Sequence, residues 1–196
     1  MDMNYLAHIY LSGEDDNLKI GNFIADSIKG KKYLTYPIEI QKGIILHRSI
    51  DTFTDSHPTV RKSVYRLFPE YSHYSAVIVD ILYDHFLAAN WLDYSEIPLE
   101  DYVNDFYQLL TNRNSVLPKR VQQFLPYMIK DNWLLSYASI DGIGKILYQM
   151  NKRTQNKSRM DLAVKELELY YDLFEAEFRS FFPELELHVA KKITTL

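Results

Sequence analysis

Histidine and aspartate side chains recur at helical spacing in residues 44–58, which read IILHRSIDTFTDSHP. His47, Asp51 and Asp55 are each four residues apart, so a helix would present all three on one face. Apolar residues surround this column, and Arg48 follows His47 directly. An imidazole and carboxylates on one helical face are typical donors to a metal ion, so this segment is a candidate metal site.

A second segment, residues 79–86 with the sequence VDILYDHF, carries the same residue types. Asp80 and Asp84 are four residues apart there, and His85 follows Asp84. Asp26 lies in a third apolar segment. Carboxylates are rarely buried unless they are paired or bind a metal. Ion pairs with a nearby arginine would neutralise only one or two of these carboxylates and would leave the others unpaired. A metal site is therefore favoured over a purely structural network.

The chemistry of such a site follows from its donors. The chain has no cysteine, so the ligands are imidazole nitrogens and carboxylate oxygens. This donor set favours Mn²⁺, Mg²⁺ or Fe²⁺, and it also admits Zn²⁺. The ion would polarise a phosphoryl oxygen and lower the pKa of a bound water, which indicates hydrolysis. The planar guanidinium of Arg48 is a candidate to hold the phosphate oxygens.

Composition bounds the remaining possibilities. The 196 residues suffice for one domain, and 47% hydrophobic and 14% aromatic residues supply a sizeable core. The formal net charge of −4 argues against a dedicated nucleic-acid binder. No window approaches the roughly 20 apolar residues of a membrane span, and the N-terminus lacks the features of a signal peptide. We therefore expect a soluble, cytoplasmic protein that does not bind membranes.

Apolar positions recur with helical period along the chain, and no run alternates with the period of a strand. Prolines, glycines and capping residues divide the chain into expected helices at 3–12, 18–30, 37–53, 58–67, 72–92, 98–110, 118–135, 141–150 and from 158 onward. Pro69 is expected to stop a helix, Pro126 to interrupt one, and Pro183 to begin a separate terminal helix. The sequence predicts a single all-α domain spanning residues 1–196.

Some polar residues also have a structural interpretation. His8, taken alone, is more typical of a hydrogen-bonded core residue than of a metal ligand. His57 and Asp55 are candidates to cap the helix that begins at Pro58.

The sequence resembles the acyl-carrier-protein phosphodiesterases in four collinear stretches of its first half. These stretches are NYLAH at 4–8, GNFIAD at 21–26, GIILHRSIDTFTD at 43–55 and DILYDHFL at 80–87, followed by Trp91. The later part matches more loosely, through its length, the WLLSY stretch at 133–137 and Arg153.

The resemblance implies an all-α fold distantly similar to the HD-domain phosphohydrolases. It also implies Mn²⁺-dependent removal of the 4′-phosphopantetheine arm from holo-acyl carrier protein, a reaction connected with fatty acid biosynthesis. The metal ligands that we expect on this basis are Asp26, His47, Asp80, Asp84 and His85. The expected catalytic residues are Asp26, His47, Arg48, Asp51 and Asp84. The order of Asp84 and His85 is the reverse of that in HD domains, so the ligand set of that superfamily cannot simply be copied.

An acyl carrier protein is acidic, so an enzyme with net charge −4 needs a local basic face to receive it. Three groups of residues are candidates for this face: Lys29, Lys31 and Lys32; Arg61, Lys62 and Arg66; and Lys152, Arg153, Lys157 and Arg159.

Two alternative functions stay open at this point. A metal-dependent hydrolase of a small phosphoester or nucleotide would need no such basic face. A non-catalytic helical protein that binds the carrier would keep its buried carboxylates ion-paired and free of metal.

Overall fold

The computed structural model describes residues 5–196, and every regular element in that range is helical, which confirms the all-α prediction. The longer elements are α1 (Tyr5–Tyr10), α2 (Asp16–Ile24), α3 (Ile38–Ser56), α4 (Pro58–Tyr71), α5 (Ser75–Ala89), α6 (Leu99–Asn112), α7 (Lys119–Lys130), α9 (Ile140–Arg153), α10 (Val164–Leu169) and α11 (Tyr171–Ile193). Shorter elements include η1 (Ala25–Ser27), η2 (Gly30–Thr35), α8 (Trp133–Ser136) and η6 (Met160–Leu162). Asn4, the first residue of the N-terminal motif, lies outside the described residues.

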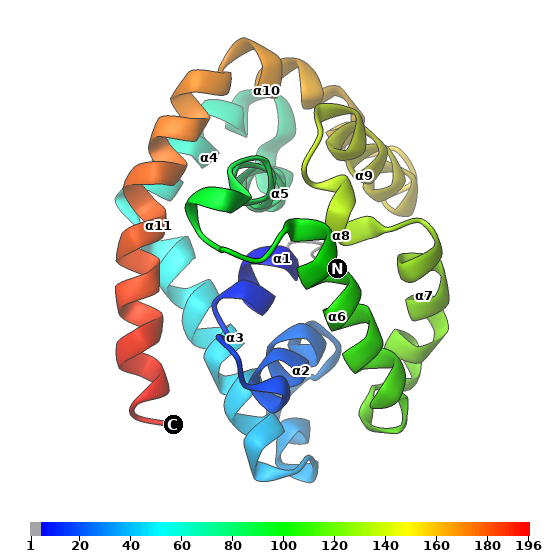
Figure 1. Cartoon of the computed structure of the whole chain (residues 1–196). Helices are drawn as coiled ribbons and strands as arrows, with labels where there is room; N and C mark the ends of the chain where they lie inside the picture. The colour runs from blue at the N-terminus through cyan, green and yellow to red at the C-terminus, as the bar shows by residue number, and fades with distance from the viewer. Residues whose placement is uncertain (1–4) are drawn as a thin grey trace.

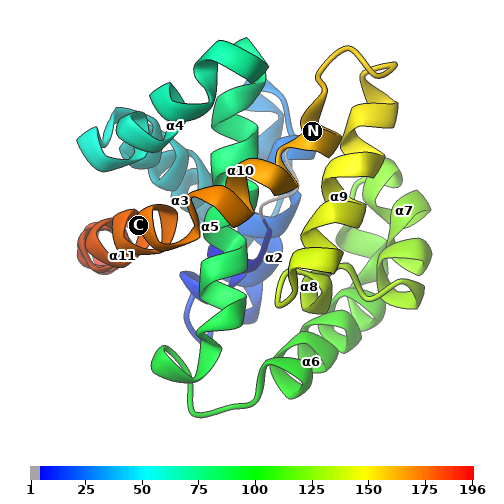
Figure 2. The same cartoon turned by 90° about the horizontal axis from the view of Figure 1, so that it is seen from above.

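The central element is α5, which has α3, α4 and α11 on one side and α6 to α9 on the other (Figures 1 and 2). Its residues from Ile81 to Ala88 are buried without interruption, as expected of a helix that is covered on all sides. One hydrophobic cluster runs from Tyr5 in α1 to Val189 in α11. Within residues 5–196, no helix combines the length and the apolar character that crossing a bilayer requires.

Three prolines lie inside helices where the sequence predicted breaks, so those predictions are wrong. Pro69 lies in α4, Pro126 in α7 and Pro183 in α11. A proline removes one backbone N–H and crowds the preceding turn, yet packing of the flanking side chains can outweigh that cost. In α11, Phe182 and Leu185 on both sides of the proline are buried and hold the helix against the core.

Two helix boundaries also differ from the prediction. The last long helix begins at Tyr171 rather than at Ser158, whose hydroxyl instead donates a hydrogen bond to Asn151 Oδ1. The segment after Lys130 is broken at Asn132, which has a left-handed backbone (φ 45°). Side-chain hydrogen bonds and a left-handed residue therefore set these ends, and helical periodicity reveals neither.

Helices α2 and α3 cross with their backbones in contact. A Cβ atom on Gly43 would lie 2.5 Å from the carbonyl oxygen of Leu18 and 2.7 Å from the Cα atom of Gly21. A Cβ atom on Gly21 would collide with the carbonyl oxygen of Ile40. Only glycine permits this approach. Because His47 lies one helical turn after Gly43, the crossing also fixes the position of that imidazole against α2.

We predict that Gly43→Ala destabilises the protein by about 1–3 kcal/mol, because the added methyl group has to push two backbones apart. Gly144→Ala is the matched control, since the nearest atom to its Cβ is a Val164 side-chain carbon at 3.5 Å. The control should be neutral or slightly stabilising, because alanine is the better helix former. Urea unfolding of both variants measures the difference, and equal effects at the two glycines would contradict this account of the crossing.

Candidate active site

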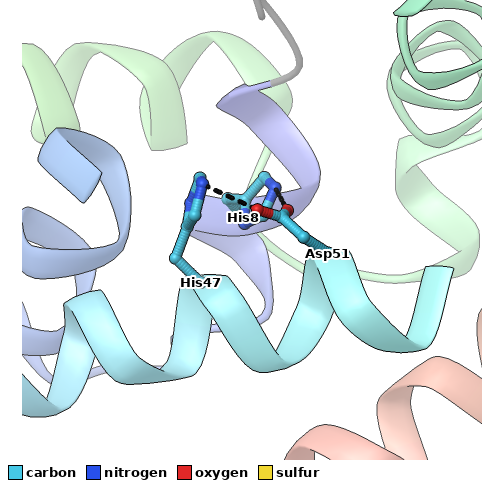
Figure 3. A group of neighbouring side chains, drawn as sticks. All are labelled: His8, His47 and Asp51. Carbon is cyan, nitrogen blue, oxygen red and sulfur yellow. Dashed lines mark ion pairs between the residues drawn. The ribbon is translucent and has the colours of Figure 1, made fainter. Parts of the chain in front are cut away.

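Two histidines and two aspartates from three elements converge where these elements meet, with both imidazoles buried. His8 comes from α1, His47 and Asp51 come from α3 (Figure 3), and Asp26 comes from η1. His47 Nε2 lies 3.2 Å from Asp26 Oδ1 and 3.2 Å from Asp51 Oδ2, while His8 Nε2 lies 3.3 Å from Asp51 Oδ1. One donor atom from each of His8, His47 and Asp51 fits within 4.8 Å, so these side chains could share one metal ion.

Asn22 sets the orientation of both imidazole rings. Its Nδ2 donates to the carbonyl oxygen of His8 at 2.8 Å and to Ser12 Oγ at 3.0 Å, so its Oδ1 faces the histidines. That oxygen lies 2.8 Å from His8 Nδ1 and 3.1 Å from His47 Nδ1. An amide oxygen only accepts, so both Nδ1 atoms carry protons. Both Nε2 atoms are therefore turned toward the carboxylates, as metal-binding histidines require.

The cluster has a surplus of negative charge that positive charge has to balance. Burial lowers the pKa of His47, but hydrogen bonds with Asp26 and Asp51 outweigh it and raise that pKa to about 9. Burial and the neighbouring His47, whose ring centroid is 4.1 Å away, lower the pKa of His8. Burial works to raise the pKa of Asp51, but its two histidine partners hold it well below the usual range. The negative charge of the carboxylates is therefore balanced by a proton on His47 or by a cation in its place.

One buried atom fits a cation better than a proton. Asp26 Oδ2 is buried, and it has no hydrogen-bond partner among the described residues. A buried carboxylate oxygen without a partner is costly unless an ion supplies the missing contact. His8, His47 and Asp51 therefore fit a shared metal ion, and Asp26, which contacts His47, is a candidate fourth ligand.

The cluster opens into a cavity of about 140 Å³ with one acidic wall and one apolar wall. The acidic residues of the lining are Asp26, Asp51, Asp55, Asp80 and Asp84. Ile50 and four residues of α11 form most of the apolar wall: Phe178, Phe181, Phe182 and Leu185. Among the described residues, no lysine or arginine lines this cavity.

Asp84, predicted as a ligand and a catalytic residue, lines the cavity but is occupied with the backbone of α1. Its Oδ2 and Oδ1 accept hydrogen bonds from the N–H groups of Leu6 (3.0 Å) and Ala7 (2.8 Å). These groups belong to the first turn of α1, where N–H groups have no partner within the helix. Burial raises the pKa of Asp84 to about 7, and the two backbone hydrogen bonds oppose that shift. Asp84 thus positions the helix that carries His8.

His85 and Asp80 lie on different sides of α5. His85 Nδ1 donates to the carbonyl oxygen of Tyr137 at 2.7 Å, and its Nε2 lies 3.2 Å from the hydroxyl of Tyr171. The structure does not bring His85 to the cluster, because adjacent residues on a helix point about 100° apart. Asp80 does line the cavity. The ligand role of both residues stays a prediction, and the geometry offers no support for it at His85.

Arg48 also lies outside the cavity lining. Its Nη2 donates to the carbonyl oxygens of Gly30 at 2.8 Å and Ile28 at 3.4 Å, and its guanidinium lies 5.0 Å from the ring centre of Tyr33. These contacts tie η2 to α3, so Arg48 is engaged in holding a surface segment. Its predicted contact with phosphate remains untested.

The sequence did not predict that His8 joins the cluster or that Asn22 orients its two imidazoles. His8 has the hydrogen bonds expected of a core residue, but its Nε2 also faces Asp51 in the cluster. Asn22 lies four residues before Asp26, and this spacing was the available signal. His57 fulfils its predicted role, since its Nδ1 accepts from the N–H of Thr59 at the start of α4.

The fold and the site define an all-α protein whose central cavity gathers imidazoles and carboxylates without sulfur. The chain belongs to the acyl carrier protein phosphodiesterase family, because the sequence model of that family matches residues 3–185. This finding confirms the resemblance seen in the sequence.

Relatives of similar length carry the same description. "Acyl carrier protein phosphodiesterase" of Pectobacterium atrosepticum is 30% identical over 184 residues, which cover 93% of this chain and 95% of the relative. The protein of that description from Enterobacter sp. (strain 638) is 29% identical over 191 residues, covering 97% and 99%. No solved structure matches the chain significantly, so the expected likeness to HD-domain phosphohydrolases stays a prediction.

We predict that Asp84→Ala lowers the free energy of unfolding by about 1–2 kcal/mol, because α1 loses its cap. Asp84→Asn should lower the free energy of unfolding by less, since the amide oxygen still accepts a hydrogen bond from one N–H. The pKa of Asp84 rises on folding from 3.8 to about 7, so the native carboxyl binds more protons in that range. Its contribution to stability therefore falls as the pH rises from about 4 to about 7, and Asp84→Asn should flatten this slope.

Urea unfolding of the wild type and both variants across this pH range measures these effects. A loss of activity in Asp84→Ala with an unchanged free energy of unfolding would contradict the capping role and favour direct catalysis.

Proposed function

We propose that this protein hydrolyses the phosphodiester that links 4′-phosphopantetheine to the serine of holo-acyl carrier protein. The observation that carries the proposal is its membership of the acyl carrier protein phosphodiesterase family over residues 3–185. Water attacks phosphorus and the bond from phosphorus to the serine oxygen breaks. The serine recovers its hydroxyl in the apo-carrier, and the arm leaves as 4′-phosphopantetheine.

A second part of the proposal is that the reaction depends on a metal ion, held by His8, His47, Asp26 and Asp51. A phosphodiester is anionic, and a cavity with five aspartates and, among the described residues, no lysine or arginine repels it unless a cation is present. The donor set of imidazole and carboxylate admits Mn²⁺, Mg²⁺, Fe²⁺ and Zn²⁺, and the resemblance to the family favours Mn²⁺ among them. When bound, the ion would polarise a phosphoryl oxygen and lower the pKa of a water molecule.

The other residues of the cavity position the reacting groups. Asn22 holds both imidazoles with their Nε2 atoms toward the carboxylates. The apolar wall from α11, which includes Phe178 and Phe181, offers contact to the uncharged part of the pantetheine arm. This division between an acidic and an apolar wall matches a substrate with a phosphate at one end and an uncharged chain beyond it.

The proposal predicts that incubation of holo-acyl carrier protein with this protein and Mn²⁺ lowers the intact mass of the carrier by that of the phosphopantetheine arm. A chelator should abolish the loss, because the phosphate then meets uncompensated carboxylates. Intact-mass spectrometry of the carrier measures the reaction and identifies the product at once.

Two variants control this experiment. Asp26→Asn should slow the release of the arm roughly 100-fold or more, since it weakens a metal ligand. Asp101→Asn, at an exposed position of α6, should behave as the wild type. An unchanged carrier mass with Mn²⁺ shown to be bound would contradict the substrate, and full turnover with chelator present would contradict the metal dependence.

A further inference from the structure

A basic segment lies next to the cluster on an otherwise acidic chain. Residues 27–38 contain three lysines, Lys29, Lys31 and Lys32, and no aspartate or glutamate, while the whole chain carries a net charge of −4. All three lysines are exposed. Within residues 5–196, none of them takes part in an ion pair. Their charge is therefore available to a partner.

This segment continues directly from the active site. Asp26 lines the cavity and contacts His47, and Lys29 follows three residues later at the start of η2. A partner that rests on the lysines would thus lie beside the carboxylate end of the cavity.

The second group of basic residues is engaged within the fold. Arg66 makes a bidentate ion pair with the buried Glu177, at 2.7 and 2.6 Å, and Lys62 lies 3.3 Å from the same carboxylate. Arg61 donates through Nε to the carbonyl oxygen of Asp55 at 3.1 Å. These contacts hold α4 against α11 and the end of α3. The positive charges of this group are therefore less available to a partner than those of the three lysines.

The third group lies away from the cavity. Residues 152–159 comprise the end of α9 and the loop after it, on the opposite side of α5 from α3 and α11 (Figure 2). The described lining of the cavity includes no residue between 85 and 177. A partner bound to this loop would be separated from the cluster by α5.

The segment next to the cluster is held in one conformation although it lies on the surface. Arg48 donates to the carbonyl oxygens of Ile28 and Gly30 and stacks on Tyr33. Gln41 Nε2 donates to the carbonyl oxygen of Tyr36 at 2.7 Å. Both anchoring side chains belong to α3, so the segment and His47 are fixed to the same helix. A surface fixed in advance loses less conformational entropy when a partner binds.

Exposed apolar side chains accompany the lysines. Leu34 is 56% exposed in η2, and Ile38 is 62% exposed at the first position of α3. Cations beside exposed aliphatic groups match a partner that combines acidic and apolar residues on one face.

We propose that Lys29, Lys31, Lys32, Leu34 and Ile38 form the docking surface for an acidic face of the acyl carrier protein. This inference rests on the proposed function, which supplies the partner. Contact with the lysines brings the carrier next to Asp26, so that its modified serine faces the cavity and the arm enters along the apolar wall.

The test reverses the charge of the segment without changing the cavity. The variant Lys29→Glu/Lys31→Glu/Lys32→Glu is compared with the matched control Lys152→Glu/Lys157→Glu/Lys165→Glu, whose lysines are also exposed. Fluorescence anisotropy of labelled apo-carrier measures binding without turnover, and intact mass of holo-carrier measures release of the arm. Circular dichroism and the melting temperature of each variant establish that the fold is kept.

We expect the first variant to bind the carrier at least about tenfold more weakly and to lose the salt dependence of binding, with the control within twofold of the wild type. Equal weakening in both variants, unchanged binding in the first, or no binding to the wild type would overturn the docking surface. If only the first variant binds the carrier more weakly, and not even the wild type releases the arm, the docking surface would be upheld and the proposed reaction refuted. Release of the arm at equal rates by all three proteins would uphold the reaction and refute the surface.

Discussion

The two histidines of the cluster share one hydrogen-bond acceptor, the Oδ1 atom of Asn22. Because that oxygen accepts a hydrogen bond from the Nδ1–H of each ring, both Nε2 atoms face the carboxylates and, in the neutral rings, are acceptors like the carboxylate oxygens. Acceptors this close repel one another unless positive charge lies between them. A proton on His47 supplies that charge in the metal-free protein, and under the proposed function a metal ion would supply it instead. The chemistry of the cavity therefore depends on the orientation that one buried amide imposes.

The surrounding fold fixes the positions of Asn22 and of the two histidines that it contacts. Contact between the backbones at Gly21 and Gly43 sets α2 against α3, and hence Asn22 against His47. The carboxylate of Asp84 caps α1 and so places His8 from a third direction. The central helix α5 that carries Asp84 is buried along most of its length, which makes it a rigid support. Precise polar geometry here rests on close apolar and backbone packing.

Much of the fold followed from hydrophobic periodicity, because the helices around α5 each bury an apolar face against the core. Helix ends were less predictable: Pro126 and Pro183 lie within helices, since tertiary packing outweighs the lost hydrogen bond. Local spacing also indicated that His47 and Asp51 meet on one face of α3. Spacing could not reveal that His85 turns toward Tyr137, or that His8 from a distant helix completes the cluster, because both depend on how separate helices meet.

The central claim is that His8, His47, Asp26 and Asp51 form the metal site. Isothermal titration of the metal-free protein with Mn²⁺ tests it most directly, in the wild type, His8→Ala and His85→Ala. The account predicts that His8→Ala weakens binding at least about tenfold, while His85→Ala binds as the wild type does. Retained affinity in His8→Ala together with loss of binding in His85→Ala would contradict it and place the ion on the other side of α5.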